Sequence, residues 1–244
     1  MNVYLAELIG TALLIVMGNG VVANVVLERT KGNGAGWIVI AAGWGLAVYT
    51  AVLCVGQFSG AHINPAVTVG LAVAGRFDWA LAPGYVGAQM AGAFLGAVLV
   101  FLFYSQHYAV TRDADAKLAT FCTAPAIRGA VTNIFCEALG TFVLVYAVLL
   151  MSDPVLAVEG MGEATIGLGS IGALPVGLIV FAIGLSLGGP TGYAINPARD
   201  LGPRLAHAVL PVPGKRDGDW AYAGVPVVGP LAGALVAALV YVVL

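Results

Sequence analysis

The sequence carries one eight-residue pattern twice. Residues 59–66 read Ser-Gly-Ala-His-Ile-Asn-Pro-Ala, and residues 191–198 read Thr-Gly-Tyr-Ala-Ile-Asn-Pro-Ala. Asn is a favoured residue at the N-cap of a helix, and Pro is favoured at the first helical position. Each Asn-Pro-Ala box therefore predicts the start of a helix. The boxes consist of Asn64, Pro65 and Ala66, and of Asn196, Pro197 and Ala198.

The apolar stretch that follows each box is too short to cross a membrane. Residues 67–75 and residues 199–210 are each about ten residues long, which gives a helix of ~15 Å, half of the ~30 Å hydrocarbon core of a bilayer. These two stretches therefore predict half-length helices.

The composition of the chain is typical of a membrane protein. Of its 244 residues, 60% are hydrophobic and only 9% are charged, whereas a soluble domain is roughly 25% charged. Ten Lys and Arg residues against twelve Asp and Glu residues leave no basic face, which excludes a nucleic-acid-binding protein. The three cysteines are odd in number and include no Cys-x-x-Cys pair, so we expect neither a disulfide framework nor a metal site. No cofactor is expected either.

Six stretches are long and apolar enough to cross the bilayer, which takes about 20 residues. They lie within residues 3–27, 37–58, 79–111, 129–152, 164–198 and 220–244. The expected fold is an all-α membrane protein with six transmembrane helices and two re-entrant half-helices.

The two halves of the chain resemble each other beyond the boxes. Glu7 and Glu137 stand in matching Glu-x-x-Gly-Thr contexts 130 positions apart, and Asn64 and Asn196 lie 132 positions apart. A weaker match relates residues 89–93 to residues 230–234. Three matches in the same order and at nearly the same spacing indicate a duplication.

The topology of this repeat follows from the number of spans. Because each half holds three spans, the second half is expected to be inverted in the membrane, with the functional site near the midplane. We expect a single membrane domain, residues 1–244, in which repeats of about 1–110 and 129–244 are joined by a loop at residues 105–128.

These features resemble the major intrinsic protein family, the aquaporins and glycerol facilitators. The resemblance rests on six spans, two Asn-Pro-Ala boxes and a Glu in the first span of each half, and it covers the whole chain. Paired boxes at this spacing are a far more specific signal than a single box. The resemblance implies a channel of aquaporin-like fold.

The boxes have a physical role in such a channel. If the half-helices meet head to head, two helix N-termini of roughly +0.5 charge each converge at the bilayer centre and repel cations. Asn64 and Asn196 would donate to a passing oxygen, and a water held by both would interrupt a proton wire. The segments before the boxes are expected to be extended, with carbonyl groups lining the pore. These carbonyls belong to Gly60, Ala61, His62, Ile63, Gly192, Tyr193, Ala194 and Ile195.

Glu7 and Glu137 are carboxylates within membrane spans, which makes them candidates for a functional role. One interpretation is a proton relay. The resemblance implies a structural role instead, in which each carboxylate accepts hydrogen bonds from backbone N–H groups and braces an extended segment.

The resemblance also implies a constriction on the outer side of the boxes, the selectivity filter. Its members here would be Trp44, Gly184, Tyr193 and Arg199. The Arg199 guanidinium would bind two adjacent hydroxyls, Trp44 and Tyr193 would contact the carbon backbone of the solute, and Gly184 would leave room. Water-selective relatives typically have His instead of Gly184, and glycerol facilitators usually have Phe instead of Tyr193.

Five further positions distinguish glycerol facilitators from water channels, and all five here resemble the glycerol type. These subfamily markers are Tyr104, Asp200, Arg204, Pro226 and Val227. Asp200 and Arg204 are four residues apart on one helix, so they are also expected to pair with each other.

The expected function is passive passage of glycerol and similar small neutral polyols, together with water, and exclusion of ions and protons. A water-selective channel and a coupled secondary transporter are the alternatives. No His-Glu-x-x-His or Walker A motif is present, and no enzyme is expected. The resemblance implies a homotetramer in the lipid bilayer of the cell membrane.

The resemblance implies cytoplasmic termini, whereas the charges predict the opposite orientation. With cytoplasmic termini, only Arg76 lies in an inner loop, which conflicts with the positive-inside rule. The outer loops then carry Arg29, Lys31, Arg112, Lys117, Arg128, Lys215 and Arg216. We expect cytoplasmic termini, because the constriction must face the side where Trp44 lies.

Overall fold

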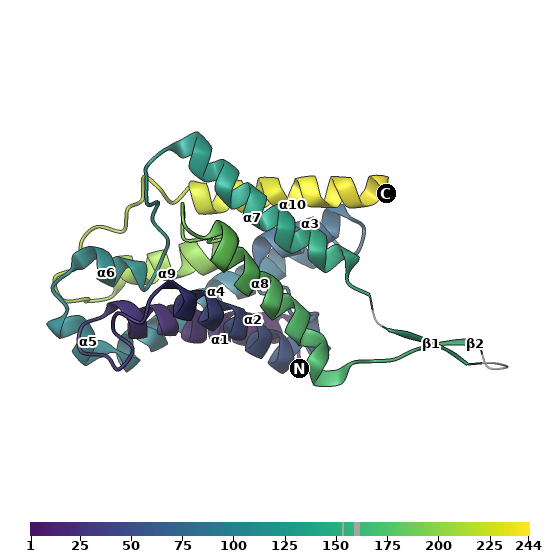
Figure 1. The fold of residues 1–244 in the computed structure, drawn as a ribbon, viewed down its shortest axis with the longest axis horizontal. Coiled ribbons are helices and arrows are strands. Elements are labelled where there is room, and N and C mark those ends of the chain that lie inside the picture. Colours follow the sequence, from purple (N-terminus) through teal and green to yellow (C-terminus); the bar gives the residue numbers. More distant parts are fainter. Residues whose placement is uncertain (153, 159–161) are drawn as a thin grey trace.

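The computed structural model describes residues 1–152, 154–158 and 162–244 (Figure 1). Within them, six helical segments are long and apolar enough to cross a membrane. One of them combines the 3₁₀ helix η1 (Gly169–Ala173) with α8 (Leu174–Leu187). The others are α1 (Val3–Val26), α2 (Trp37–Ser59), α4 (Ala82–Phe103), α7 (Ala130–Leu150) and α10 (Val225–Val243). The predicted membrane fold of six spans is confirmed.

Both half-helices are present, and each begins two residues before the predicted apolar stretch. α3 (Pro65–Val73) has nine residues and α9 (Pro197–Val209) has thirteen. As the boxes predict, Asn is the N-cap and Pro is the first helical residue of each, so the box itself forms the start of the helix. In Figure 1, α9 and α3 extend from the middle of the bundle toward opposite ends.

Glycines allow the long helices to pack closely, α1 against α4 and α7 against α10. A Cβ atom at Gly92 would lie 2.2 Å from the carbonyl oxygen of Leu8, and one at Gly233 would lie 2.0 Å from that of Ala138. Neither position has room for a side chain, so the backbones themselves are in contact. The two contacts occupy matching positions in the two halves of the chain.

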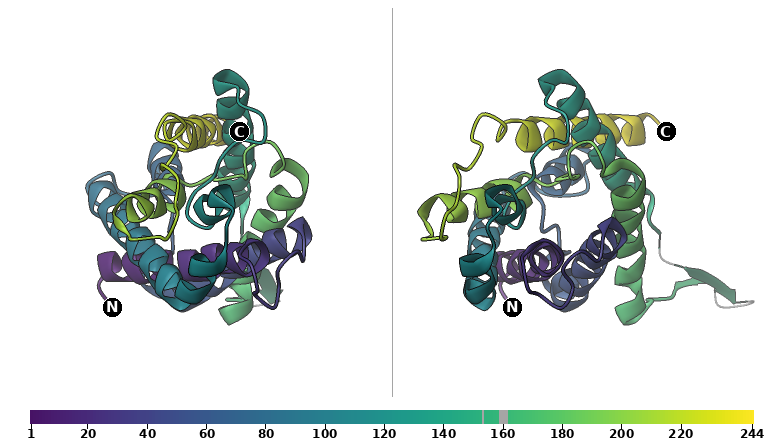
Figure 2. Two further views of the ribbon diagram at one scale, coloured as in Figure 1. Left: turned by 90° about the vertical axis from the view of Figure 1, so that its left-hand side faces the viewer. Right: turned by 60° about the vertical axis from the view of Figure 1, so that its left-hand side comes forward.

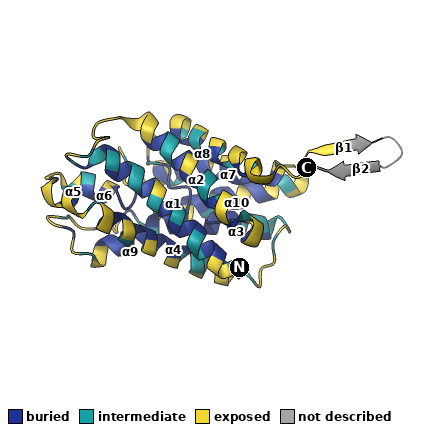
Figure 3. Ribbon diagram, turned by 90° about the horizontal axis from the view of Figure 1, so that it is seen from below, coloured by how far each residue is buried: buried dark blue, intermediate teal, exposed yellow. Residues whose placement is uncertain are grey.

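Figure 3 shows which residues of the bundle are exposed and which are buried; many of the exposed residues are large and hydrophobic, and the buried ones include charged residues. Phe103 and Val131 are each 83% exposed, whereas Glu7, Glu137 and Arg204 are 0% exposed. Such a surface is favourable where the solvent is lipid hydrocarbon, because lipid chains are as apolar as these side chains.

The segment between the halves is more ordered than the predicted loop at residues 105–128. It contains α5 (Ser105–Val110) and α6 (Ala114–Ala119), and the Asp113 carboxylate caps α6 by accepting from the N–H groups of Asp115 and Ala116. These short helices lie at one end of the bundle (Figures 1 and 2).

An antiparallel hairpin that the sequence analysis did not predict connects α7 to η1. It consists of β1 (Val155–Val158) and β2 (Gly162–Thr165), with Val155 opposite Thr165. The hairpin projects from the end of the bundle opposite α5 and α6, toward which both chain termini also lie (Figures 1 and 2).

Candidate pore and its constriction

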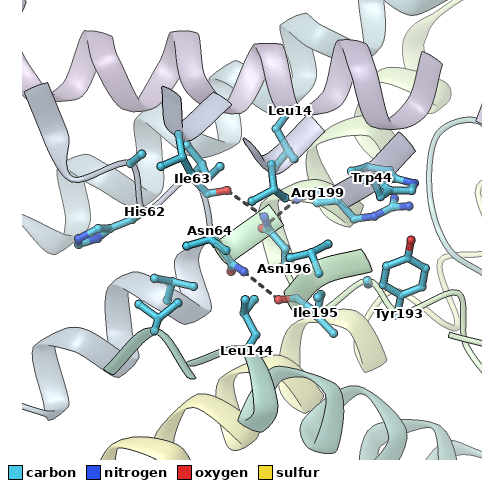
Figure 4. A pocket seen from close by; sticks show the side chains of 18 of the residues that line it. Leu14, Trp44, His62, Ile63, Asn64, Leu144, Tyr193, Ile195, Asn196 and Arg199 are labelled. Carbon is cyan, nitrogen blue, oxygen red and sulfur yellow. Dashed lines mark hydrogen bonds between the residues drawn. The ribbon is translucent and has the colours of Figure 1, made fainter. Parts of the chain in front are cut away.

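The N-termini of the two half-helices meet inside the bundle (Figure 4). Asn64 Nδ2 donates to the Ile195 carbonyl at 2.8 Å, and Asn196 Nδ2 donates to the Ile63 carbonyl at 2.8 Å. Each asparagine thus binds the residue that precedes the other asparagine. This reciprocal pair joins the two halves of the chain at the predicted meeting point of the boxes.

Each asparagine also caps its own half-helix. Asn64 Oδ1 accepts from the Ala66 N–H at 2.9 Å, and Asn196 Oδ1 accepts from the Ala198 and Arg199 N–H groups at 3.0 and 3.1 Å. A side-chain amide has two N–H groups, and each asparagine uses one of them on a carbonyl. Within the described residues, the second N–H of each asparagine is therefore available to a molecule in the pore.

The two intramembrane glutamates hold the segments that precede the half-helices. Glu7 accepts from the backbone N–H of His62 at 3.0 Å and from that of Ile63 at 2.7 Å, one at each carboxylate oxygen. Glu137 accepts at 3.0 and 2.7 Å from the residues at the matching positions, Ala194 and Ile195. These contacts place both carboxylates behind the pore-lining segments.

These segments have an unusual backbone that needs such support. Four non-glycine residues have a left-handed conformation with φ between 40° and 48°: Ala61, Ile63, Tyr193 and Ile195. This conformation costs an L-residue roughly 1–2 kcal/mol, and it persists only where the surroundings determine it. By binding N–H groups of these segments, the Glu7 and Glu137 carboxylates hold the backbone in this conformation.

A cavity of about 120 Å³ adjoins both asparagines, and its lining combines apolar side chains with polar groups. The apolar part comes from Leu14, Val48, Val52, Val67, Leu71, Leu144, Val148, Val176 and Val180. The polar part comes from Asn64, Asn196, Arg199 and the two extended segments, of which all predicted members except Gly192 line the cavity. A solute with hydroxyls on one side and carbon on the other matches this arrangement.

Three of the four predicted filter residues gather at one end of the cavity (Figure 4). The Arg199 guanidinium lies over the Trp44 ring, 4.1 Å from its centroid. Arg199 Nη1 and the Tyr193 hydroxyl are buried and have no hydrogen-bond partner among the described residues. Buried polar groups are normally paired, so these two atoms, which belong to residues that line the cavity, have hydrogen-bonding capacity left over at this end of it.

Gly184, the fourth predicted member, is not among the residues that line the cavity. A Cβ atom there would lie 2.8 Å from both Cζ and Oη of Tyr193. The Tyr193 ring therefore packs into the room that Gly184 leaves.

The predicted pair of Asp200 and Arg204 is present and fully buried, with 2.8 Å between the carboxylate and Nη2. Asp200 also accepts from the Thr123 N–H at 2.8 Å and from its hydroxyl at 2.7 Å. Arg204 donates onward to the carbonyls of Thr123 and Gly218. The network ties the two loops at this end of the bundle to α9, next to Arg199.

The other subfamily markers are not brought together. Tyr104 is the C-cap of α4 and lines a separate hollow between α1 and α4. Pro226 and Val227 lie in the first turn of α10. None of the three lines the pore cavity.

Several polar residues near Glu7 were not predicted as part of the site. Gln89 Nε2 donates to Glu7 at 2.8 Å and to the Thr68 hydroxyl at 3.0 Å, and the Ser59 hydroxyl donates to Glu7 at 2.6 Å. His62 Nδ1 lies 3.1 Å from the same Thr68 hydroxyl. The available signals were a Gln within an apolar span and the Ser that opens the repeated pattern. Among the described residues, no group of three His, Cys, Asp or Glu side chains is placed to hold a metal ion.

Comparison with known proteins agrees with this architecture. The family model for the major intrinsic protein matches residues 1–241. The chain belongs to the major intrinsic protein family. The members of this family are membrane channels. Together with the six apolar helices, this makes the chain a multi-pass membrane protein.

Curated relatives resemble this major intrinsic protein over nearly its full length. It is 56% identical to the probable glycerol uptake facilitator protein of Thermotoga maritima, over 99% of this chain and 98% of the relative. It is 50% identical to the glycerol uptake facilitator protein of Bacillus subtilis, over 96% of this chain and 81% of the relative. The crystal structure of the aquaglyceroporin from Plasmodium falciparum matches with a TM-score of 0.82 at 31% identity, covering 98% and 94% of the two chains.

Proposed function

We propose that this protein is a passive channel for glycerol and similar small neutral polyols, which also passes water and excludes ions and protons. The observation that carries the proposal is the end of the cavity where unpaired Arg199 Nη1 and Tyr193 Oη lie near the Trp44 ring. Polar atoms beside an apolar wall suit a carbon chain with hydroxyls along one side. The relatives named as glycerol uptake facilitators support the same solute.

Exclusion of cations follows from the charges around the cavity. Two helix N-termini and the Arg199 guanidinium present positive potential to an entering ion. Apolar side chains form much of the wall and cannot replace the hydration shell of an ion. A water bound to the free N–H groups of Asn64 and Asn196 accepts from both, which interrupts proton transfer along a file of waters.

A coupled secondary transporter is disfavoured by the state of the two glutamates. Glu7 and Glu137 each bind two backbone N–H groups and are fully buried. A carboxylate in this position acts as a structural acceptor and offers no exposed site for a coupling ion. The channel performs no chemistry on its solute.

Stopped-flow light scattering on proteoliposomes distinguishes the remaining alternatives. We expect glycerol entry and water exit to be faster than in empty vesicles, and proton entry to be unchanged. Fast water flux with glycerol flux equal to that of empty vesicles would instead establish a water-selective channel.

We further propose a homotetramer, with one pore in each subunit, in the cell membrane and with cytoplasmic termini. Apolar outward faces and close-packed glycines are compatible with association in lipid. Light scattering coupled to size exclusion tests the oligomer, and a mass equal to one subunit would refute it. Protease digestion of a C-terminal tag in right-side-out vesicles tests the orientation, and cleavage from outside would refute it.

A further inference from the structure

Trp37 is outside the pore but contacts two of the predicted filter residues. It is the first residue of α2, it is 41% exposed, and it is not among the residues that line the cavity. Its indole Nε1 donates to the Gly184 carbonyl at 2.8 Å. That carbonyl lies in the last turn of α8, where carbonyl groups lack partners within the helix. The indole therefore fixes the end of α2 against the end of α8.

The same indole packs edge-on against the Tyr193 ring, with centroids 5.8 Å apart and planes at 75°. Beneath both rings lies Gly188, where a Cβ atom would lie 2.6 Å from each of Trp37 Cζ2, Tyr193 Cδ1 and the Gly184 carbonyl oxygen. Gly184, one turn earlier in α8, contacts the far end of the Tyr193 ring. Two glycines thus form a floor for the Tyr193 ring, and Trp37 closes one side of it.

We propose that Trp37 is a positioning residue for polyol size, which keeps the Tyr193 ring on this glycine floor and so sets the width of the constriction. The inference rests on the proposed function, because it concerns which polyols pass. The backbone of Tyr193 is fixed by its left-handed conformation and by the neighbouring N–H groups that Glu137 binds. A substitution of Trp37 is therefore expected to move the Tyr193 ring and to leave the Tyr193 backbone in place.

Opposite substitutions around the ring predict opposite effects. Trp37→Leu removes the indole and its N–H, which frees space beside the Tyr193 ring on the side away from the pore. Gly188→Ala adds a methyl group beneath the ring and displaces it toward the pore. The first change widens the constriction, and the second narrows it.

The test measures rates of glycerol, erythritol and xylitol entry into proteoliposomes, normalised to the amount of channel. Because the Tyr193 ring loses its aromatic neighbour, Trp37→Leu is expected to raise the xylitol-to-glycerol ratio by roughly three- to tenfold. Trp37→Phe keeps a ring and is expected to restore part of the wild-type ratio. Gly188→Ala is expected to lower the ratio, and Trp37→Phe keeps the inference testable if Trp37→Leu or Gly188→Ala does not fold.

Matched controls separate this effect from a general loss of structure. Trp79 is 54% exposed and lies just before α4, and a Cβ atom at Gly87 in α4 would have no neighbouring atom within 4 Å. Trp79→Leu and Gly87→Ala should leave the ratio unchanged. If the xylitol-to-glycerol ratio is unchanged in both Trp37→Leu and Gly188→Ala, the inference about Trp37 is overturned. Fast glycerol flux through the wild-type protein in the same experiment would still support the proposed function. If the wild type passes only water, the proposed function fails, and the inference then requires Trp37→Leu to admit glycerol.

Discussion

Replacing Glu7 with Gln tests whether this buried carboxylate is a brace or a proton carrier. Its two oxygens bind different backbone donors, one the N–H of His62 at 3.0 Å and the other the N–H of Ile63 at 2.7 Å. A glutamine offers only one oxygen. Whichever way its amide turns, one of the two backbone N–H groups faces an NH₂ group and loses its acceptor.

The expected destabilisation from Glu7→Gln follows from this geometry. A buried donor left unpaired costs about 1–3 kcal/mol, and because the lost acceptor was a carboxylate we expect the upper end, about 3 kcal/mol. For a chain of this length, each kcal/mol lowers the unfolding midpoint by about 2–4 °C, which gives a fall on the order of 10 °C. Glu137→Gln should fall by a similar amount, because its two oxygens are divided between Ala194 and Ile195 in the same way.

The assay for Glu7→Gln is thermal unfolding of the purified protein in detergent, followed by tryptophan fluorescence. Glu28→Gln is the matched control, since Glu28 accepts from a single backbone N–H, that of Arg112 at 2.8 Å, which a glutamine oxygen can retain. An unchanged midpoint for Glu7→Gln would refute the brace. A proton flux in wild-type proteoliposomes that disappears in Glu7→Gln would establish a relay instead.

Three further substitutions test the packing and the buried charges. Gly233→Ala places a methyl carbon 2.0 Å from the Ala138 carbonyl and should abolish the folded fraction seen by size exclusion. Asp200→Ala leaves buried Arg204 unpaired and should destabilise by about 3–5 kcal/mol, whereas the double variant with Arg204→Leu should recover most of the unfolding midpoint. Lys215→Met removes three bonds of 2.6–2.9 Å from the ammonium group to carbonyls at the end of α9, and it should lower the midpoint by a few degrees.

Each of these predictions has a result that contradicts it. Gly87→Ala is the control for the first, and equal folded yields of the two glycine variants would show that the helices can separate without cost. For the buried pair, a double variant no more stable than Asp200→Ala alone would show that the unpaired charge is not the cause. For Lys215→Met, an unchanged midpoint would show that the three carbonyls find other donors.

The sequence was sufficient to predict the elements that follow local rules. Hydropathy places the six spans, and the N-cap preference of Asn with the helix-start preference of Pro places α3 and α9 to within two residues. The expectation that Glu7 and Glu137 bind backbone N–H groups came from the family resemblance. No local sequence rule predicts which donors a buried carboxylate binds. The short helices α5 and α6 and the β-hairpin carry no strong periodicity, and the sequence reasoning treated their segments as loops or span ends.

The packing of the constriction could not be predicted from the sequence. Trp37 and Gly184 are 147 positions apart, and their hydrogen bond depends on how α2 and α8 pack. The sequence predicts that Gly184 leaves room, but which group fills that room depends on the rotamer of Tyr193. Such contacts are decided by tertiary packing, which spacing along the chain does not specify.

Glycerol entry into proteoliposomes, measured by stopped flow at several temperatures, tests most directly whether a polyol passes the two box asparagines. Passage through a preformed tube predicts entry much faster than in empty vesicles and only weakly dependent on temperature. Glycerol entry with the rate and the steep temperature dependence of the bare bilayer, alongside rapid water exit, would contradict it.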